Sequence, residues 1–214
     1  MQLYTYFRSS AAYRVRIALG LKGLDWTAIP VHLVRDGGEQ HSATYKALNP
    51  GALVPTLKDG GAVINQSLAI IEYLDERHPE PPLLPVDAVA RAQVRALAYD
   101  IACDVHPLNN LRVLQYLENQ LQVDAQAKQQ WYLHWVKLGL EAFEQQLANH
   151  QQAGPFCYGE VPTLADICLV PQVFNAHRFG FDTGHLARIT RAVQACEALP
   201  AFQQARPERQ ADAQ

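Results

Sequence analysis

The pattern of hydrophobic and polar positions changes along the chain, from short strand-like runs before residue 65 to long helical stretches after residue 87. The runs QLYTY, DWTAIPVHL, VPTL and AVIN have the composition of strands, and the turn signal KDGG separates the last two. Between the first two runs, AAYRVRIALGLKG has the pattern of a helix. The start of the chain is therefore predicted to form a βαβ unit followed by a hairpin.

A further helix is predicted directly after the hairpin, in the run SLAIIEYLDERH. Ser67 at its start is a residue type that caps helix N-termini. The apolar positions at helical spacing are Leu68, Ile70, Ile71 and Leu74. The resulting order of elements, βαβ(α)ββα, is that of an α/β thioredoxin-like domain.

A change of composition marks a domain boundary in the proline-rich stretch HPEPPLLPVD. Proline restricts both itself and the residue before it to extended conformations, so this stretch is predicted to be a connector. We therefore expect a thioredoxin-like domain over residues 1–78, a linker over 79–87 and an all-α helical domain over 88–214.

The second half of the chain carries long helical patterns without strand signals. One pattern covers residues 90–119 and is interrupted at Pro107, which should kink it or start a new segment. Another covers residues 123–150. A third opens with Thr163 and Asp166 at the spacing of a capping box. The polar tail RPERQADAQ has nothing to bury and is expected to lie loose or to drape on the surface.

Composition and charge exclude several classes of function. The chain has 214 residues, 49% of them hydrophobic, which is enough for one large core or two modest ones. Its net charge of -3 gives no general attraction to nucleic acid. The first residues lack the features of a signal peptide and no apolar run is long enough to span a membrane, so we expect a cytoplasmic protein.

The four cysteines, Cys103, Cys157, Cys168 and Cys196, are widely spaced and contain no CxxC pair. This spacing suggests neither a zinc site nor a dithiol redox pair, and no metal is expected. Most of the cysteines are predicted to be small buried residues.

Candidate chemistry begins in the stretch RSSAAYRVRIAL. Ser9 and Ser10 precede a helix predicted to begin near Ala11, where backbone N–H groups point outward and the helix dipole is positive. Such a position binds anions. A serine here also serves as a plain helix cap, but two serines leave one to spare.

Motifs along nearly the whole chain, in the right order, resemble the zeta class of glutathione transferases, the maleylacetoacetate isomerase family. They are SSAAYRVRIAL, ALNPGALVPTL, NQSLAIIEYLDE, LLP, HPLNNLRVL and TLADICLVPQVFNAHRF. QSLAIIEYL indicates a glutathione transferase of some class. The opening motif SSAAYRVRIAL together with the run LVPQVFNAHRF points to the zeta class. The resemblance implies the glutathione transferase fold, glutathione as cofactor and a homodimer.

The resemblance implies that Ser9 donates to the glutathione sulfur while Ser10 and the helix start complete a positive pocket. A thiol has a pKa near ~8.5 and reacts as the thiolate, so a catalyst must lower this pKa. Position alone leaves the ranking of the two serines open. The family frequently has Cys directly after the serines, whereas this chain has Ala11 at that place in the glutathione site. Any sulfur chemistry must therefore use glutathione.

Other contacts to glutathione are also implied by the resemblance. Val54 and Pro55 resemble the Val–cis-Pro pair whose backbone holds the cysteinyl part like an added strand. Gln66 and Ser67 precede or begin a helix that can receive a carboxylate, and Ser67 as a plain cap is compatible with this role. Further positions that match family residues near glutathione are Gln40, His106, Asn110 and Arg112. His106 precedes Pro107, and a structural role at the kink stays open for it.

The implied second substrate is a cis diketo acid such as maleylacetoacetate, bound in the helical domain. Thiolate addition would convert its double bond into a single bond, and rotation and loss of glutathione would give the trans product. Arg8 and Arg178 are the candidates for holding its carboxylates and stabilising the enolate, because guanidinium groups bind carboxylates in a bidentate manner. Arg14, on the first helix, is expected to have a structural role.

Three functions remain possible: the isomerase, a general glutathione transferase that conjugates electrophiles such as haloacids, and a binding protein without chemistry. The serine pair and the VP, QS and HPLNN motifs argue against the third. Maleylpyruvate is an alternative substrate. Leu111 lies where a further arginine would bind a smaller diacid, so its apolar character favours the larger maleylacetoacetate.

Overall fold

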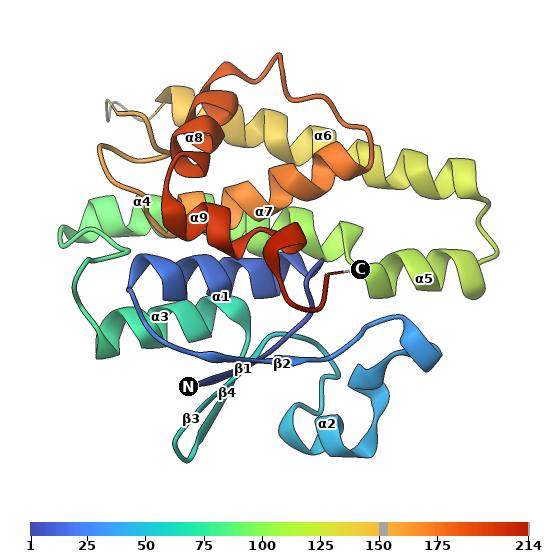
Figure 1. Ribbon diagram of the computed structural model, residues 1–214. Helices are drawn as coiled ribbons and strands as arrows, with labels where there is room; N and C mark the ends of the chain where they lie inside the picture. Colours follow the sequence, from blue (N-terminus) through green and yellow to red (C-terminus); the bar gives the residue numbers. More distant parts are fainter. Residues whose placement is uncertain (150–153, 214) are drawn as a thin grey trace. The chain divides into compact units, whose positions relative to one another are not determined.

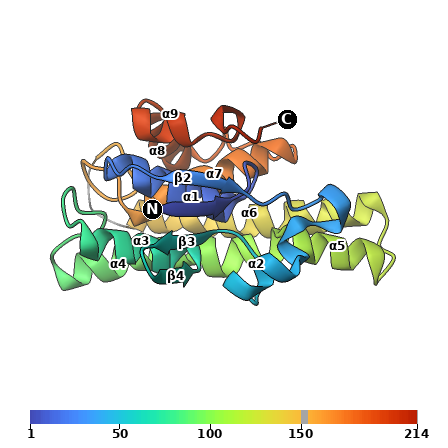
Figure 2. The same ribbon diagram turned by 60° about the horizontal axis from the view of Figure 1, so that its bottom comes forward.

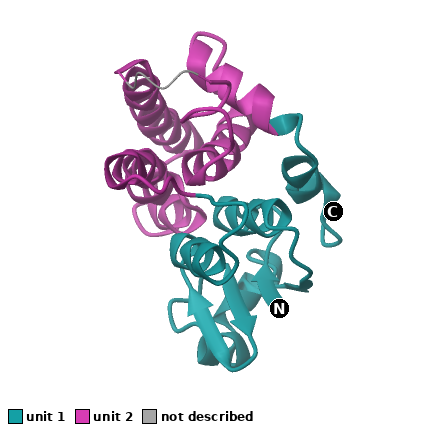
Figure 3. Cartoon of the chain, turned by 90° about the vertical axis from the view of Figure 1, so that its left-hand side faces the viewer, with its two compact units in different colours: residues 1–83, 197–214 teal, residues 84–196 magenta. Residues whose placement is uncertain are grey.

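The computed structural model describes residues 1–149 and 154–213, and the chain folds into two compact units (Figure 3). Unit 1 contains residues 1–83 together with the C-terminal segment that starts at Glu197. Unit 2 contains residues 84–196.

The C-terminal segment is where the structure differs from the predicted division into domains. The sequence predicts that residues 88–214 form one helical domain, but the segment from Glu197 groups with unit 1. The reason is that helix α9, Pro200–Ala205, packs against α1, Ser10–Leu21. Local helical periodicity does not indicate which partner a helix packs against.

Unit 1 contains a four-stranded mixed sheet with the strand order β2-β1-β3-β4. β1 is parallel to β2 and antiparallel to β3, which pairs with β4 as a hairpin; Figure 2 brings this sheet forward. The elements of this part are β1 Gln2–Thr5, α1 Ser10–Leu21, β2 Thr27–Pro30, α2 Ala43–Leu48, β3 Thr56–Asp59, β4 Ala62–Asn65 and α3 Ser67–Arg77. The predicted thioredoxin-like order βαβαββα is confirmed.

Side chains of β1 alternate between the two faces of this sheet. The ring of Tyr4 contacts Tyr45 of α2, with the ring centroids 6.0 Å apart. The hydroxyl of Thr5, the next residue, accepts a hydrogen bond from Arg16 of α1. Helices α1 and α3 therefore cover one face and α2 the other (Figure 1).

The chain that leaves α3 is fixed by one buried lysine at the C-terminal end of α1. The ammonium of Lys22 pairs with Asp75 of α3 and donates to the carbonyls of His78 and Pro81, at 2.7 and 2.6 Å. These carbonyls lie in the predicted proline-rich connector, which forms no helix or strand. The predicted connector is thus irregular rather than helical, with several bends, and it is anchored to the fold at its start.

Unit 2 is built from helices. They are α4 Ala88–Tyr99, the π-helical turn η3 Asp100–Val105, the 3-10 turn η4 His106–Asn109, α5 Leu111–Asn119, α6 Ala125–Asn149, α7 Leu164–Arg178 and most of α8 Ala187–Glu197. The interruption at Pro107 is confirmed, although the regular helix already ends at Tyr99. The last residue of the helix predicted over 123–150 lies outside the described residues.

A fully buried carboxylate lies in the first turn of α7. Asp166 accepts hydrogen bonds from the backbone N–H groups of Cys157 and Thr163, both at 2.8 Å, and the predicted capping box is present. The two donors reach different oxygens of the carboxylate. Burial raises the pKa of Asp166, and these hydrogen bonds lower it in part.

We expect Asp166→Asn to lower the free energy of unfolding by about 1–3 kcal/mol, because an amide N–H₂ would face one of the two backbone donors. Urea denaturation measures this loss. The matched control is Asp182→Asn, at an exposed aspartate that accepts from the N–H of Gly184. Equal stability changes in the two variants would contradict the structural role of Asp166.

Candidate active site

The turn between β1 and α1 presents a hydroxyl at a helix N-terminus. Helix α1 begins at Ser10, one residue earlier than predicted, because Ser9 is its N-cap. The Ser9 hydroxyl oxygen accepts from the N–H of Ala12 at 3.2 Å. A serine hydroxyl that accepts one bond still has its own hydrogen to donate. The capping role is therefore present and is compatible with donation to an anion.

The two serines of the turn differ in accessibility. Ser9 is half-buried, whereas Ser10 is buried and is the first residue of the helix. Arg8 before them is exposed, and its guanidinium lies 4.8 Å from the centroid of the Phe7 ring. A ligand at this turn would thus reach the hydroxyl of Ser9 more readily than that of Ser10.

The loop before β3 is held by a polar network that the sequence analysis missed. The Tyr45 hydroxyl and the Asn49 amide both donate to the carbonyl of Leu53, at 2.6 and 2.7 Å. The next peptide bond, Val54–Pro55, is cis, as the resemblance implies. The NPG turn in ALNPGALVPTL is the sequence signal that points to this network.

The start of α3 lies next to a buried arginine of α1. Ser67 is buried as the first residue of α3, and Arg14 donates to its hydroxyl at 3.4 Å. Arg14 is only 2% exposed, so its expected structural role fits its position. Gln66, with a positive φ of 73°, is exposed beside this helix start. The positive end of the helix and the guanidinium together favour a carboxylate here.

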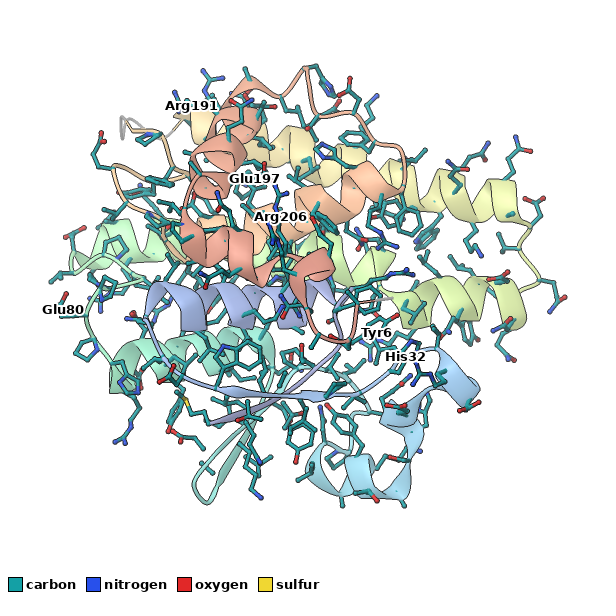
Figure 4. The ribbon with its side chains drawn as sticks, viewed as in Figure 1. Tyr6, His32, Glu80, Arg191, Glu197 and Arg206 are labelled. Atoms are coloured by element: carbon teal, nitrogen blue, oxygen red, sulfur yellow. The ribbon has the colours of Figure 1, made fainter. Side chains whose placement is uncertain are left out.

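Gln40 is buried in the short 3-10 turn η2, Glu39–His41, rather than turned to solvent. Its amide nitrogen donates to the carbonyl of Leu33 at 3.2 Å. Its amide oxygen is buried and has no hydrogen-bond partner among the described residues. The same loop begins near His32, whose ring lies edge-on to Tyr6 with the centroids 5.0 Å apart (Figure 4).

In unit 2, three candidate glutathione contacts lie at the break between α4 and α5. The Asn110 side-chain amide lies 3.1 Å from Nε2 of His106, and its oxygen accepts from the N–H of Arg112. Asn110 is thus the N-cap of α5. These bonds join His106 to the helix break, which supports a structural contribution from His106.

Arg178 lines a pocket within unit 2. It is the last residue of α7, is exposed and donates to the Asn175 side chain at 2.9 Å. The pocket has a volume of about 490 Å³, and its lining residues are Leu114, Ala125, Lys128, Gln129, Arg178, Phe179 and Gly180. Two cationic side chains and an apolar wall suit a small carboxylic acid.

The cysteines offer no evident nucleophile. Cys103 is exposed and the other three are buried, as predicted for most of them, and none of the four forms a disulfide. Burial raises the pKa of the Cys157 thiol well above its usual value, and the nearby Asp166 carboxylate raises it further. In the part of the chain that the structure describes, no group of three or more His, Cys, Asp or Glu side chains is placed to hold a metal ion.

Among the helices of the described residues, none is both long and apolar enough to cross a bilayer.

Comparison with known proteins gives matches over the whole chain. The family model for the glutathione S-transferase N-terminal domain matches residues 3–82. A probable maleylacetoacetate isomerase of Vibrio cholerae is 52% identical over 211 residues, covering 99% of this chain and 97% of that protein.

Solved structures give the same result. The holo structure of maleyl pyruvate isomerase, a bacterial zeta-class glutathione S-transferase, superposes with a TM-score of 0.97 at 44% identity over 100% of both chains. Maleylacetoacetate isomerase from Methylobacterium extorquens AM1, with bound malonate and GSH, superposes with a TM-score of 0.95 at 37% identity, again over 100% of both chains.

Proposed function

Because the chain belongs to the zeta class of glutathione transferases, the maleylacetoacetate isomerase family, we propose that it isomerises maleylacetoacetate to fumarylacetoacetate with glutathione as cofactor. The observation that carries this function is the β1–α1 turn. The half-buried Ser9 lies at the positive end of a 12-residue helix. The next residue but one is Ala11, at the position where the family frequently has a cysteine, so this turn contains no protein thiol. The sulfur that reacts is therefore that of glutathione.

The reaction proceeds by reversible addition of the thiolate. The Ser9 hydroxyl and the N-terminal N–H groups of α1 stabilise the thiolate and so lower the pKa of the thiol. The sulfur lone pair attacks the cis double bond, and the electron pair moves onto the neighbouring ketone oxygen as an enolate. The former double bond is now single and rotates. The enolate electrons then re-form the double bond as trans and expel the thiolate, so glutathione is regenerated.

Glutathione is bound along unit 1 at three places. The thiol lies at the β1–α1 turn, the backbone of Val54 pairs with the cysteinyl part, and Ser67 at the start of α3 receives a carboxylate. Arg14 supports the last contact, because its guanidinium donates to the Ser67 hydroxyl. Gln40 is a further proposed contact, because its buried amide oxygen has no hydrogen-bond partner among the described residues and can accept from an N–H of glutathione.

The remaining site residues are those that the resemblance to the family implies. His106, Asn110 and Arg112 bind glutathione. Arg178 in its pocket and Arg8 at the β1–α1 turn bind carboxylates of the substrate, with the enolate oxygen as the alternative for Arg8. Leu111, beside Arg112, favours the larger maleylacetoacetate over maleylpyruvate.

A spectroscopic assay of maleylacetoacetate and maleylpyruvate, each with and without glutathione, tests this function. We expect isomerisation of both acids only when glutathione is present, with the higher kcat/KM for maleylacetoacetate. Isomerisation that needs no glutathione would refute the mechanism. Conjugation of a neutral chloroarene at a rate above that of isomerisation would instead favour a general transferase.

We also propose that the protein is cytoplasmic and forms a homodimer. None of the four cysteines forms a disulfide, which suits a compartment where glutathione keeps cysteines reduced. Sedimentation equilibrium of the purified chain, of monomer mass 23.9 kDa, tests the dimer. A monomer mass at micromolar concentration would contradict it.

Replacement of all four cysteines by Ala or Ser should leave glutathione-dependent isomerisation largely intact, because no protein thiol takes part. The three buried positions are expected to lose stability, so circular dichroism must first show that the variant folds. A folded cysteine-free protein without activity would point to a different mechanism.

A further inference from the structure

The backbone of Phe7 is held from both sides by side chains of unit 1. Its N–H donates to the carboxylate of Asp212 at 3.0 Å. Its carbonyl accepts from the guanidinium of Arg16, also at 3.0 Å. Phe7 lies in the turn that leads to the catalytic serine, and Asp212 lies 205 residues further along the chain. The C-terminal tail is therefore part of the structure around the turn.

Arg16 connects this turn to the C-terminal segment. It is 2% exposed and donates to the Thr5 hydroxyl and to the carbonyl of Ala205, both at 3.1 Å. Burial lowers its pKa to about 10, and the negative charge of Asp212 acts in the opposite direction. The carboxylate and the guanidinium thus stabilise each other while each binds one end of the Phe7 residue.

We name residues 206–213 the C-terminal strap. The strap is anchored where it starts, because Arg206 pairs with Glu197 at 2.6 Å and the two side chains point toward each other in Figure 4. At its other end, Ala213 packs against a cluster of apolar residues. The members of this cluster are Tyr6, Phe7, Val31, Tyr45 and Val54. The polar tail was predicted to lie loose or to drape on the surface. The loose alternative is wrong, because polar and apolar partners distant in sequence hold the tail.

The position of Phe7 determines that of Ser9. The N–H of Ser9 donates to the carbonyl of Tyr6 at 3.0 Å, so the turn from Tyr6 to Ser9 is a single hydrogen-bonded unit. A shift of the Phe7 peptide would move both the Ser9 hydroxyl and the first turn of α1. The stabilisation of a thiolate depends on the distance and direction of these donors.

We propose that Asp212 of the C-terminal strap is a positioning residue for the isomerase, which holds the β1–α1 turn in the geometry that activates glutathione. The proposal rests on the proposed function of Ser9. Asp212 does not touch the reacting atoms and acts through the Phe7 peptide. Removal of its carboxylate eliminates one of the two side-chain hydrogen bonds that hold the N–H and the carbonyl of Phe7.

The test compares Asp212→Ala with Asp212→Asn, and with Glu208→Ala as the matched control. Glu208 is an exposed carboxylate on the same strap, and it lies 3.7 Å from Arg206. For each protein, the thiol of bound glutathione is titrated by its ultraviolet thiolate absorbance, and kcat/KM is measured as a function of pH. Thermal unfolding is followed by circular dichroism.

In Asp212→Ala we expect the thiol pKa to rise by roughly one unit, with a tenfold loss of kcat/KM at neutral pH that disappears at a pH above the thiol pKa. Asp212→Asn should restore much of the activity, because its amide oxygen still accepts from Phe7. Glu208→Ala should match the unmodified protein.

An unchanged thiol pKa in Asp212→Ala would overturn the proposal, and so would a loss of activity that is equal at every pH. The proposed function is tested separately by the unmodified protein. If that protein binds glutathione but does not isomerise the diketo acids, the proposed function fails. The thiolate titration of the Asp212 variants still decides the role of the strap.

Discussion

Replacement of Ser9 by alanine is expected to raise the pKa of the bound glutathione thiol and to slow isomerisation at neutral pH by roughly ten- to a hundredfold. The loss corresponds to about 1.5–3 kcal/mol for a hydrogen bond to a charged group. The Ser9 hydroxyl already accepts from Ala12, so it has one hydrogen left for the thiolate. Ser10→Ala should have a smaller effect, because the Ser10 residue is buried at the helix start.

The pH dependence of this variant follows from the sign of the pKa change. The unmodified turn stabilises the thiolate, so Ser9→Ala has less thiolate at any pH below its raised pKa. The ratio of the two activities should therefore be largest at low pH and approach one when glutathione is fully ionised in both proteins. An ultraviolet titration of bound glutathione measures the two pKa values directly.

The control for Ser9→Ala must account for the lost helix cap, which by itself costs about 0.5–2 kcal/mol of stability. Ser42→Ala is matched for this purpose, because Ser42 caps α2 and accepts from the N–H of Tyr45 at the same distance of 3.2 Å. We expect Ser42→Ala to lose stability without a change in the thiol pKa. A thiol pKa that is the same in Ser9→Ala as in the unmodified protein would rule out the proposed role of Ser9.

Elements with local signals could be predicted from the sequence. The periodicity of SLAIIEYLDERH indicates α3, and the spacing of Thr163 and Asp166 indicates the start of α7, because both depend on residues within one or two helical turns. The break at Pro107 is of the same kind. The cis bond at Val54–Pro55 came from the resemblance alone, since its backbone geometry has no local sequence signal.

Features that depend on partners far apart in the sequence could not be predicted. The tail RPERQADAQ has no periodicity, and its contact with Phe7 is visible only once the chain has folded. The π-helical turn that follows the end of α4 at Tyr99 could not be predicted either, because no residue type in this stretch indicates it. Arg16 is also such a case, because a helical arginine is usually solvated, whereas here four oxygen atoms satisfy a buried guanidinium.

The arginine variants Arg8→Ala and Arg178→Ala distinguish an isomerase from a general transferase. Each variant is expected to have a lower kcat/KM for maleylacetoacetate, because a charged bidentate contact to a carboxylate or enolate is lost. The decrease corresponds to a loss of about 2–5 kcal/mol in transition-state binding free energy. The two side chains are available for this contact, since Arg8 is exposed at the β1–α1 turn and Arg178 lines the pocket of unit 2. Lysine at either position should restore only part of the activity, since it keeps the charge but not the planar fork.

A neutral chloroarene is the reference substrate for these variants, because its conjugation needs the thiolate but no carboxylate clamp. We expect its kcat/KM to change much less than that of maleylacetoacetate in both variants. Arg191→Ala, at an exposed arginine of α8, serves as the control and should affect neither substrate (Figure 4). If Arg8→Ala and Arg178→Ala slow both reactions equally, these arginines support the fold or the glutathione site, and their assignment to the substrate carboxylates is wrong.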